Sequence, residues 1–249
     1  MDLGLEGKIA LVTGASKGLG RAIAAGLVRE GARVAISSRS RERIEAAAAD
    51  IGASAFVHDS ADLDAVPALV DSVERELGPI EVLVTNTGGP PPGPDPLGFS
   101  RDEWEAAYRD LVLAPMALIE RVVPGMRERG FGRIVNVAST SVREPIGNLM
   151  LSNAHRASMI TAFKTISRAV AGDGLTLNTL LPGRIATERA YSLSGSPEAA
   201  EASAANEVPA GRMGRPEEMA AVAAFLCSAR AGYVTGETVA VDGGLTQSI

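Results

Sequence analysis

The chain alternates short apolar runs with longer amphipathic stretches. Runs rich in β-branched and aliphatic residues predict seven strands, at 8–14, 33–38, 54–59, 80–86, 132–139, 175–183 and 238–244. Between them apolar positions recur with helical spacing and predict helices at 18–32, 41–52, 62–78, about 100–128, about 150–172 and about 215–228. This alternation predicts an α/β fold, a single Rossmann-type doubly wound domain whose seven-stranded parallel sheet carries helices on both faces.

Composition narrows the class of protein. The 249 residues are 46% hydrophobic and 22% charged, which is typical of a soluble globule, and we expect one domain over 1–249. The net charge of −6 argues against a nucleic-acid partner, which needs clustered positive charge. No apolar run approaches the roughly 18 residues that span a bilayer, and the N-terminus lacks a signal-peptide pattern. We therefore expect a cytoplasmic protein without a membrane partner.

Few residues suggest a metal or a reactive thiol. Cys227 is the only cysteine and lies in the apolar stretch AAVAAFLCSA, so we expect a small buried hydrophobic side chain rather than a nucleophile. No metal site is predicted.

A proline-rich segment follows the fourth predicted strand. GGPPPGPDPLG, at 88–98, holds five of the 14 prolines and must be an irregular, stiffened loop. In open α/β sheets ligands bind at the carboxyl ends of strands. We therefore expect this loop to border a site.

The segment TGASKGLG joins the first predicted strand to the first helix. Gly14, Gly18 and Gly20 allow a tight turn and a close approach of the backbone to a pyrophosphate at the helix N-terminus. Between them lie Ser16, Lys17 and Leu19, which we include in the predicted cofactor site. The alternative is a glycine-rich turn that serves packing alone.

The end of the second predicted strand bears on the type of dinucleotide. A carboxylate there would bind the ribose 2′-hydroxyl of NAD, but this chain has Ser38 followed by Arg39. Lys17 lies in the glycine loop, so the region has two cations, Arg39 and Lys17, and no acid. This combination suits the 2′-phosphate of NADP. NADP(H) is therefore favoured over NAD(H), although Arg39 could also be an ordinary solvated charge.

Five segments carry a family resemblance. TGASKGLG, VLVTNTG, GRIVNVAS, LNTLLPGRIAT and GYVTGETVAVDGG resemble the short-chain dehydrogenase/reductase family in order and spacing, with 3-oxoacyl-carrier-protein reductases and sugar or alcohol dehydrogenases most similar. The resemblance implies a homotetramer and a substrate lid at about 184–212. It also implies three sets of cofactor contacts. Asp59 and Ser60 would contact the adenine side, Asn86 and Gly88 the adenosine ribose, and Pro182, Gly183 and Thr187 the nicotinamide side.

The same resemblance implies four catalytic positions, of which only one keeps the family residue. Ser139 lies where the family has its substrate-holding Ser, whereas Ser152 replaces the proton-donating Tyr thirteen residues later and Arg156 replaces the Lys. Asp110 lies where the family has an Asn. The chain thus resembles an atypical branch that lacks the Tyr-x-x-x-Lys pair.

These substitutions restrict the acid–base chemistry. Ser152 is a much poorer acid than a phenol, and Arg156 stays charged, so it can bind a ribose diol or an oxyanion but cannot relay a proton. Asp110 could form a structural ion pair with Arg156 or act in a proton relay. His155 and Tyr191 are alternative proton donors, although a surface or interface histidine and an ordinary lid aromatic are the simpler interpretations.

Three hypotheses follow. The favoured one is an NADP(H)-dependent oxidoreductase that interconverts a small-molecule carbonyl and an alcohol, with Arg156 also binding the cofactor. The alternatives are a cofactor-binding family member without turnover, acting as a sensor or partner subunit, and an enzyme of different chemistry on the same scaffold. Arg127 and Arg129 could contact an acidic acyl carrier, but Asp173 lies where a matching second basic residue is expected.

Overall fold

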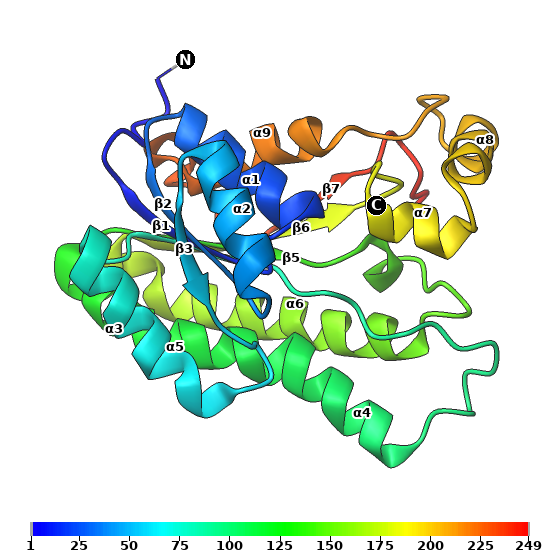
Figure 1. The fold of residues 1–249 in the computed structure, drawn as a ribbon, viewed down its shortest axis with the longest axis horizontal. Coiled ribbons are helices and arrows are strands. Elements are labelled where there is room, and N and C mark those ends of the chain that lie inside the picture. Colours follow the sequence, from blue (N-terminus) through cyan, green and yellow to red (C-terminus); the bar gives the residue numbers. More distant parts are fainter. Residues whose placement is uncertain (1, 249) are drawn as a thin grey trace.

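A computed structural model describes residues 2–248 and has a parallel sheet at its centre (Figure 1). The seven strands are β1 Ile9–Thr13, β2 Arg33–Ser38, β3 Ser54–Val57, β4 Val82–Thr85, β5 Gly132–Val137, β6 Leu175–Pro182 and β7 Thr238–Val241. They are ordered β3-β2-β1-β4-β5-β6-β7, and every neighbouring pair is parallel. The predicted seven-stranded doubly wound fold is confirmed.

Helices connect the strands. They are α1 Gly18–Arg29, α2 Arg41–Ile51, α3 Val66–Leu77, α4 Arg101–Tyr108, α5 Ala114–Arg129, α6 Met150–Val170, α7 Glu188–Ser194, α8 Pro197–Glu207 and α9 Pro216–Cys227. Short 3-10 turns are η1 Leu63–Ala65, η3 Thr140–Val142, η4 Ala171–Asp173 and η5 Ala229–Ala231, and η2 Arg109–Leu113 is a π-helical turn. Parallel strands need such crossovers, which is why the chain alternates.

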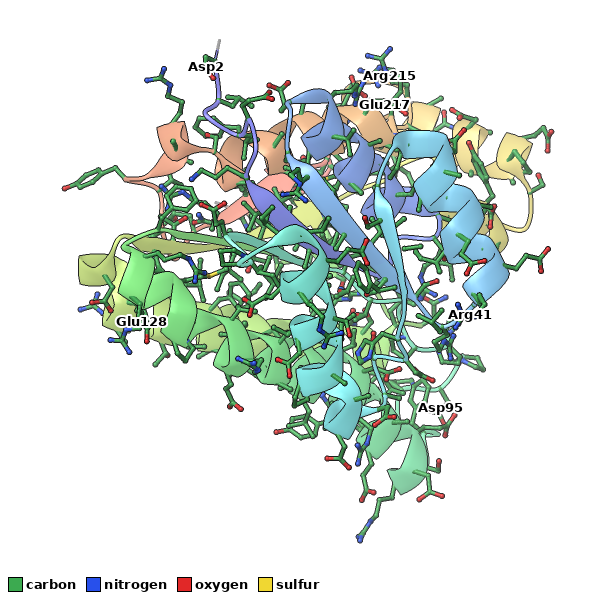
Figure 2. The ribbon with its side chains drawn as sticks, turned by 60° about the vertical axis from the view of Figure 1, so that its left-hand side comes forward. Asp2, Arg41, Asp95, Glu128, Arg215 and Glu217 are labelled. Atoms are coloured by element: carbon green, nitrogen blue, oxygen red, sulfur yellow. The ribbon has the colours of Figure 1, made fainter. Side chains whose placement is uncertain are left out.

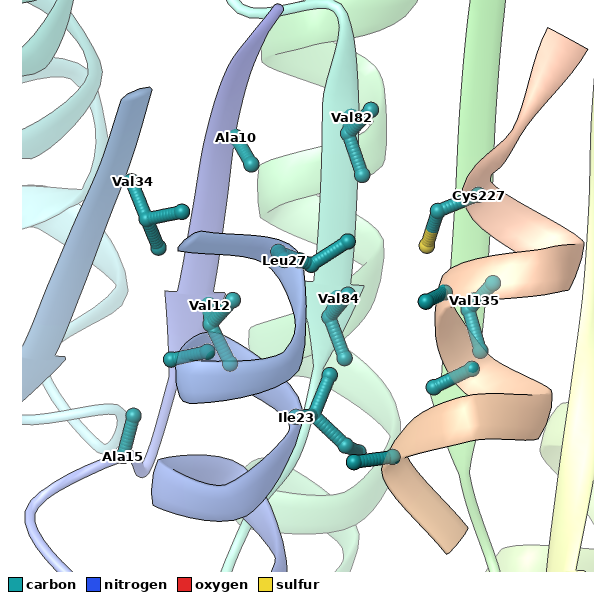
Figure 3. Close-up of a cluster of buried hydrophobic side chains, with 14 of the residues drawn as sticks. Ala10, Val12, Ala15, Ile23, Leu27, Val34, Val82, Val84, Val135 and Cys227 are labelled. Atoms are coloured by element: carbon teal, nitrogen blue, oxygen red, sulfur yellow. The ribbon is translucent and has the colours of Figure 1, made fainter. Parts of the chain in front are cut away.

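Two hydrophobic layers hold the sheet between the helices. Alternate residues of β1 point to opposite faces, so Ala10 and Val12 join one layer while Ile9 and Leu11 join the other. The first layer packs under α1, α2 and α9, and Figure 3 shows its side chains between the sheet and two of these helices. The second layer packs under α3, α5 and α6. Charged side chains such as Arg41, Asp95 and Glu128 lie at the periphery (Figure 2).

Several predicted boundaries differ from the structure. The predicted helix at 100–128 is interrupted by the π-helical turn η2, because one residue is inserted into its hydrogen-bonding pattern. The predicted strand at 54–59 ends at Val57, and the helix predicted from residue 62 begins with a 3-10 turn. The predicted lid at 184–212 contains α7 and α8, which pack on a separate small apolar cluster. The loop at 88–98 is irregular, as predicted.

The strand order reverses between β1 and β4, since β2 and β3 extend to one side and β5, β6 and β7 to the other. In doubly wound sheets, ligands bind outside the carboxyl ends of the strands at this point. The loops after β1, β4, β5 and β6 all meet there. No helix among residues 2–248 is long and apolar enough to cross a membrane.

Candidate functional site

The glycine loop after β1 is packed tightly on its inner side. Gly14 and Gly18 both have φ of +59°, a left-handed conformation that favours glycine. A Cβ on Gly20 would lie 2.6 Å from the Gly14 carbonyl oxygen and 2.7 Å from Asn86 Nδ2. Asn86 Nδ2 in turn donates to the Gly14 oxygen at 3.0 Å and to the Thr13 oxygen at 3.3 Å. Asn86, predicted to line the ribose, therefore also fastens the loop to the end of β4.

The outer side of the same loop is open. A Cβ on Gly18 would meet nothing closer than Thr187 Cγ2 at 3.9 Å, and one on Gly88 would meet nothing within 4 Å. Lys17 precedes α1 without a side-chain cap, so this side chain leaves the first backbone N–H groups of the twelve-residue helix free to bind a ligand. Ser16 and Leu19 are half-buried beside it. This cradle fits a pyrophosphate on a helix N-terminus.

The end of β2 also fits a ligand. Ser38 Oγ is buried and has no hydrogen-bond partner within the described chain, which is unusual for a buried polar atom. Arg39 follows it and pairs with no carboxylate of residues 2–248. An adenosine ribose or its 2′-phosphate at this place would supply both groups with a partner.

Lys17 has a partner that the sequence did not indicate. Its ammonium lies 2.5 Å from Glu188 Oε2 at the start of α7, and both side chains are well exposed. The hydrogen bond from Lys17 lowers the pKa of Glu188 below its ordinary value. The contact joins the glycine loop to the predicted lid. A cofactor phosphate would compete with Glu188 for Lys17.

Asp59, predicted to lie at the adenine side, affects the charge state of Asp110. Asp59 Oδ1 accepts a hydrogen bond from Ala61 N at 3.1 Å, and Ser60 beside it is half-buried. Burial and the neighbouring Asp59 charge raise the pKa of Asp110, while Arg39 and Arg109 oppose that shift. Asp110 thus lies within range of the Asp59 charge, which follows β3.

The predicted ion pair between Asp110 and Arg156 is wrong. No carboxylate of the described chain lies within 4 Å of the Arg156 guanidinium, and the charge that most affects Arg156 is that of Arg189. Arg156 instead donates to Ser152 and to the Val137 oxygen, and the charges that act on Asp110 are those of Asp59, Arg39 and Arg109.

Ser139, Ser152 and Arg156 lie where β5 ends and α6 begins. Arg156 Nε donates to Ser152 Oγ at 3.1 Å, and its Nη1 donates to the Val137 carbonyl oxygen at 2.7 Å. Ser139 lies two residues beyond Val137, and its Oγ accepts from Ser141 N at 3.1 Å. Both serine hydroxyls are therefore acceptors in these contacts and keep their own protons for a further partner.

Burial changes the acidity of Arg156. Loss of solvent and, secondarily, the like charge of Arg189 lower the pKa of Arg156 to about 10. The guanidinium still carries its proton at neutral pH. It acts here as a fixed positive charge with hydrogen bonds in defined directions.

The end of β6 holds the residues predicted for the nicotinamide side. Gly183 N donates to the Val241 oxygen at 3.1 Å, and a Cβ on Gly183 would lie 2.6 Å from Asp242 Cβ. Thr140 Oγ1 donates to the Pro182 oxygen at 3.4 Å, which joins β6 to the turn after Ser139. Thr187 caps α7 by accepting from Ala190 N at 3.3 Å. Pro182, Gly183 and Thr187 thus lie at the same edge of the sheet as Ser139.

The two alternative proton donors have packing roles. The His155 ring packs on Trp104 and Tyr108 of α4, with centroid distances of 5.3 Å and 5.8 Å, and burial lowers its pKa. Tyr191 packs against the small apolar cluster of the lid. Neither contact involves Ser139 or Ser152, so the geometry favours the simpler interpretation for both residues.

The other candidate residues have structural roles. Arg127 forms an ion pair with Asp173 at 2.6 Å, and Arg129 donates to the Ile80 oxygen at 2.8 Å. Cys227 is fully buried, and burial raises the pKa of its thiol to about 12, as expected of an inert packing residue. Within 2–248 no cluster of three or more His, Cys, Asp or Glu residues could hold a metal ion.

The sequence analysis missed Arg189. This arginine of α7 reaches across to the proline-rich loop, where Nη2 donates to the Pro90 carbonyl oxygen at 3.1 Å. A Cβ on Gly89 would lie 2.5 Å from Nη2, so glycine leaves the room that the guanidinium occupies. The only signal in the sequence is its position two residues after Thr187, which does not indicate this contact.

The chain is similar to known proteins over nearly its whole length. Residues 14–246 match the family model described as Enoyl-(Acyl carrier protein) reductase. A curated relative, the 3-oxoacyl-(acyl-carrier-protein) reductase FabG of Vibrio harveyi, is 37% identical over 249 residues, which cover 98% of this chain and 99% of the relative.

Solved structures agree with this. L-Sorbose reductase from Gluconobacter frateurii, complexed with NADPH and L-sorbose, is 32% identical with a TM-score of 0.92, and both chains are covered completely. The 3-oxoacyl (acyl-carrier-protein) reductase of Agrobacterium tumefaciens C58 with NADP bound is 30% identical with a TM-score of 0.90, covering 98% of this chain and 96% of the other. By sequence and by fold, the chain belongs to the short-chain dehydrogenase/reductase family, with 3-oxoacyl-carrier-protein reductases among its relatives.

Proposed function

We propose that this chain is an NADP(H)-dependent oxidoreductase that interconverts a carbonyl and an alcohol, using Ser139, Ser152 and Arg156 in place of the family's Ser, Tyr and Lys. Membership of a family of nicotinamide-dependent oxidoreductases supports the reaction class. The observation that carries the proposal is the contact of Arg156 Nε with Ser152 Oγ beside the end of β5.

The cofactor site is supported by vacant hydrogen-bonding capacity. Gly18 and Gly88 leave open space, and Ser38 Oγ is buried without a partner. Arg39 supplies a positive charge beside Ser38, and Lys17 supplies a second one if it leaves Glu188. Two structural relatives are complexes with NADPH or NADP. When bound, NADPH supplies a hydride to the carbonyl carbon.

The chain's own residues stabilise the oxygen of the substrate. During reduction this oxygen gains negative charge, which hydroxyl donors and a nearby cation stabilise. Ser152 accepts from Arg156, so its own proton is free to point at the substrate oxygen, and Ser139 is placed in the same way. The proton that completes the alcohol comes from water through Ser152, since neither serine is acidic enough to stay ionised.

Asp110 is left out of this proton path. Its carboxyl lies near Asp59 and Arg39, at the adenine side, and its raised pKa results from burial there. We propose that Asp110 shapes the adenine end of the cofactor site.

A small-molecule substrate is favoured over one attached to an acyl carrier. An acidic carrier protein needs free positive charge, but the Arg127 charge is matched by Asp173 within the chain. The lid at 184–212 closes over the substrate in this proposal, because Glu188 and Arg189 already contact the loops after β1 and β4.

The test is NADPH oxidation with a panel of ketones, quinones and 3-oxoacyl thioesters. Turnover by the wild type that falls at least tenfold in Ser152→Ala supports the proposal, because about 1.4 kcal/mol of transition-state stabilisation corresponds to that factor. Ser72→Ala, on α3 and away from the proposed site, is the matched control and keeps full activity.

A second candidate is a cofactor-binding protein without turnover. It is favoured by the absence, at positions 139, 152 and 156, of any side chain that titrates near neutral pH. Micromolar affinity for NADPH together with no turnover across the whole panel would support it instead.

We also propose a homotetramer that uses the outer face of α6. This face carries small residues whose hydroxyls are already satisfied within the helix: Thr161 and Thr165 donate to carbonyl oxygens four residues earlier, and Ser158 donates to that of His155. A face of this kind can approach another helix closely. Light scattering on the purified protein tests the assembly, and a monomer mass would contradict it.

A further inference from the structure

Two arginines near the proposed site have no acidic partner among the described residues. Arg156 lies on α6 and Arg189 on α7, and neither forms an ion pair within residues 2–248. The other arginines of the lid segment are matched, since Arg184 pairs with Glu207 at 2.6 Å and Arg212 with Glu218 at 2.7 Å. Within the lid segment at 184–212, Arg189 is therefore the one arginine without a carboxylate partner.

The positive charge of Arg156 is not compensated by its contacts. Its two protein acceptors are a neutral hydroxyl on Ser152 and a neutral carbonyl at Val137. Removing a guanidinium from water without an anion is costly, and the lowered pKa of Arg156 reflects that cost. An anion at this place would remove the cost.

Arg189 adds a second positive charge from α7. Its contact with the Pro90 oxygen fixes it between the lid and the loop after β4, and burial lowers its pKa. Its charge also lowers the pKa of Arg156, so the two guanidinium groups are close enough to repel each other. Figure 1 shows α7, the loop before α4 and the N-terminal end of α6 at the same edge of the molecule.

We propose that Arg156 and Arg189 bind a carboxylate of the substrate, so that this chain acts on oxo acids or hydroxy acids rather than on neutral ketones or alcohols. A guanidinium is planar and matches the two oxygens of a carboxylate. The inference rests on the proposed oxidoreductase function and names the class of substrate for it.

The same arginines could instead bind the diphosphate of the cofactor. The structure favours the substrate, because the cradle for a diphosphate is the glycine loop at 14–18, at the N-terminus of α1. Arg156 lies beside Ser152, where the reacting oxygen is proposed to bind. A carboxylate bonded to the reacting carbonyl carbon would reach both arginines.

The first experiment measures binding without turnover. The protein loaded with NADP+ is titrated by calorimetry with oxamate, which has a carboxylate, and with oxamide, its neutral counterpart. We expect oxamate to bind and oxamide not to bind. Arg189→Ala should weaken oxamate binding about 10- to 100-fold, which is the range for loss of one charge-assisted contact. It should leave the Kd for NADP+ unchanged.

Two variants serve as controls. Arg184→Ala removes a lid arginine that already has an acidic partner, and it should change neither oxamate nor NADP+ binding. Arg189→Lys keeps the charge and should recover part of the oxamate affinity, which a merely structural loss would not show.

The second experiment measures turnover of 2-oxo acids and of their methyl esters. We expect kcat/KM to be at least tenfold higher for the acids, and Arg189→Ala to remove this preference through KM. Equal turnover of acids and esters that is insensitive to Arg189→Ala would leave the oxidoreductase proposal intact and overturn the inference. Weaker NADP+ binding by Arg189→Ala, with oxamate unaffected, would also overturn it. Oxamate binding that depends on Arg189 without turnover of any compound would retain the anion site and refute the oxidoreductase proposal.

Discussion

Arg156→Lys tests whether the directed hydrogen bonds of the guanidinium, and not only its charge, serve the reaction. Arg156 uses two different nitrogens, Nε for Ser152 and Nη1 for Val137. A lysine has one ammonium on a flexible stem and cannot donate to both acceptors in this geometry. The substitution therefore keeps the charge and loses one contact.

The expected loss of rate follows from that contact. A hydrogen bond to a charged group contributes about 1.5–3 kcal/mol, so kcat at neutral pH should fall roughly 10- to 150-fold if the Ser152 contact serves the transition state. NADPH oxidation at saturating substrate measures this, and the KM for NADPH separates an effect on cofactor binding from one on the reaction.

The pH dependence provides a second readout. Burial and the Arg189 charge lower the pKa of Arg156 to about 10, so this group stays protonated through pH 9 in the wild type. A lysine has a lower intrinsic pKa than an arginine, and the same burial and like charge should lower it further. The protonated form is the active one, so the variant should lose kcat at a lower pH than the wild type does as the pH rises. Superimposable pH profiles, or an unchanged kcat, would refute the reasoning.

Three further predictions concern the cofactor site. Arg39→Ala should weaken NADPH by about 10- to 100-fold and leave NADH unchanged, as measured by equilibrium binding, because the guanidinium has no other acidic partner among the described residues; equal losses for both dinucleotides would contradict a phosphate contact. Glu188→Gln should tighten NADPH a few-fold, by roughly the factor that an exposed ion pair is worth, since it releases Lys17; an unchanged affinity would mean that the phosphate does not use Lys17. Gly20→Ala should lower the free energy of unfolding by about 1–3 kcal/mol, because its Cβ would lie 2.6 Å from the Gly14 oxygen, whereas the control Gly172→Ala, with nothing within 4 Å, should not.

The fold could be predicted from hydrophobic periodicity alone, because a parallel sheet buries both faces of its strands and needs a helix between each pair. The seven apolar runs were long and regular enough to show this. The glycine loop was also evident, since a tight turn before a helix restricts residue type locally. The boundaries of β3 and the π-helical turn at 109–113 were not, because both depend on contacts between distant segments.

The functional site likewise has features that the sequence predicts and features that depend on contacts between distant segments. Residue type alone sets which chemistry is present: Ser152 and Arg156, one helical turn apart, restrict the site to a weak acid beside a permanent cation. The partners of each group depend on tertiary contacts. The fold places Asp110 within range of the Asp59 charge, pairs Lys17 with Glu188, and brings Arg189 of α7 to Pro90. The physical reason is that residue type is set locally, whereas charge pairing depends on which loops meet at the end of the sheet.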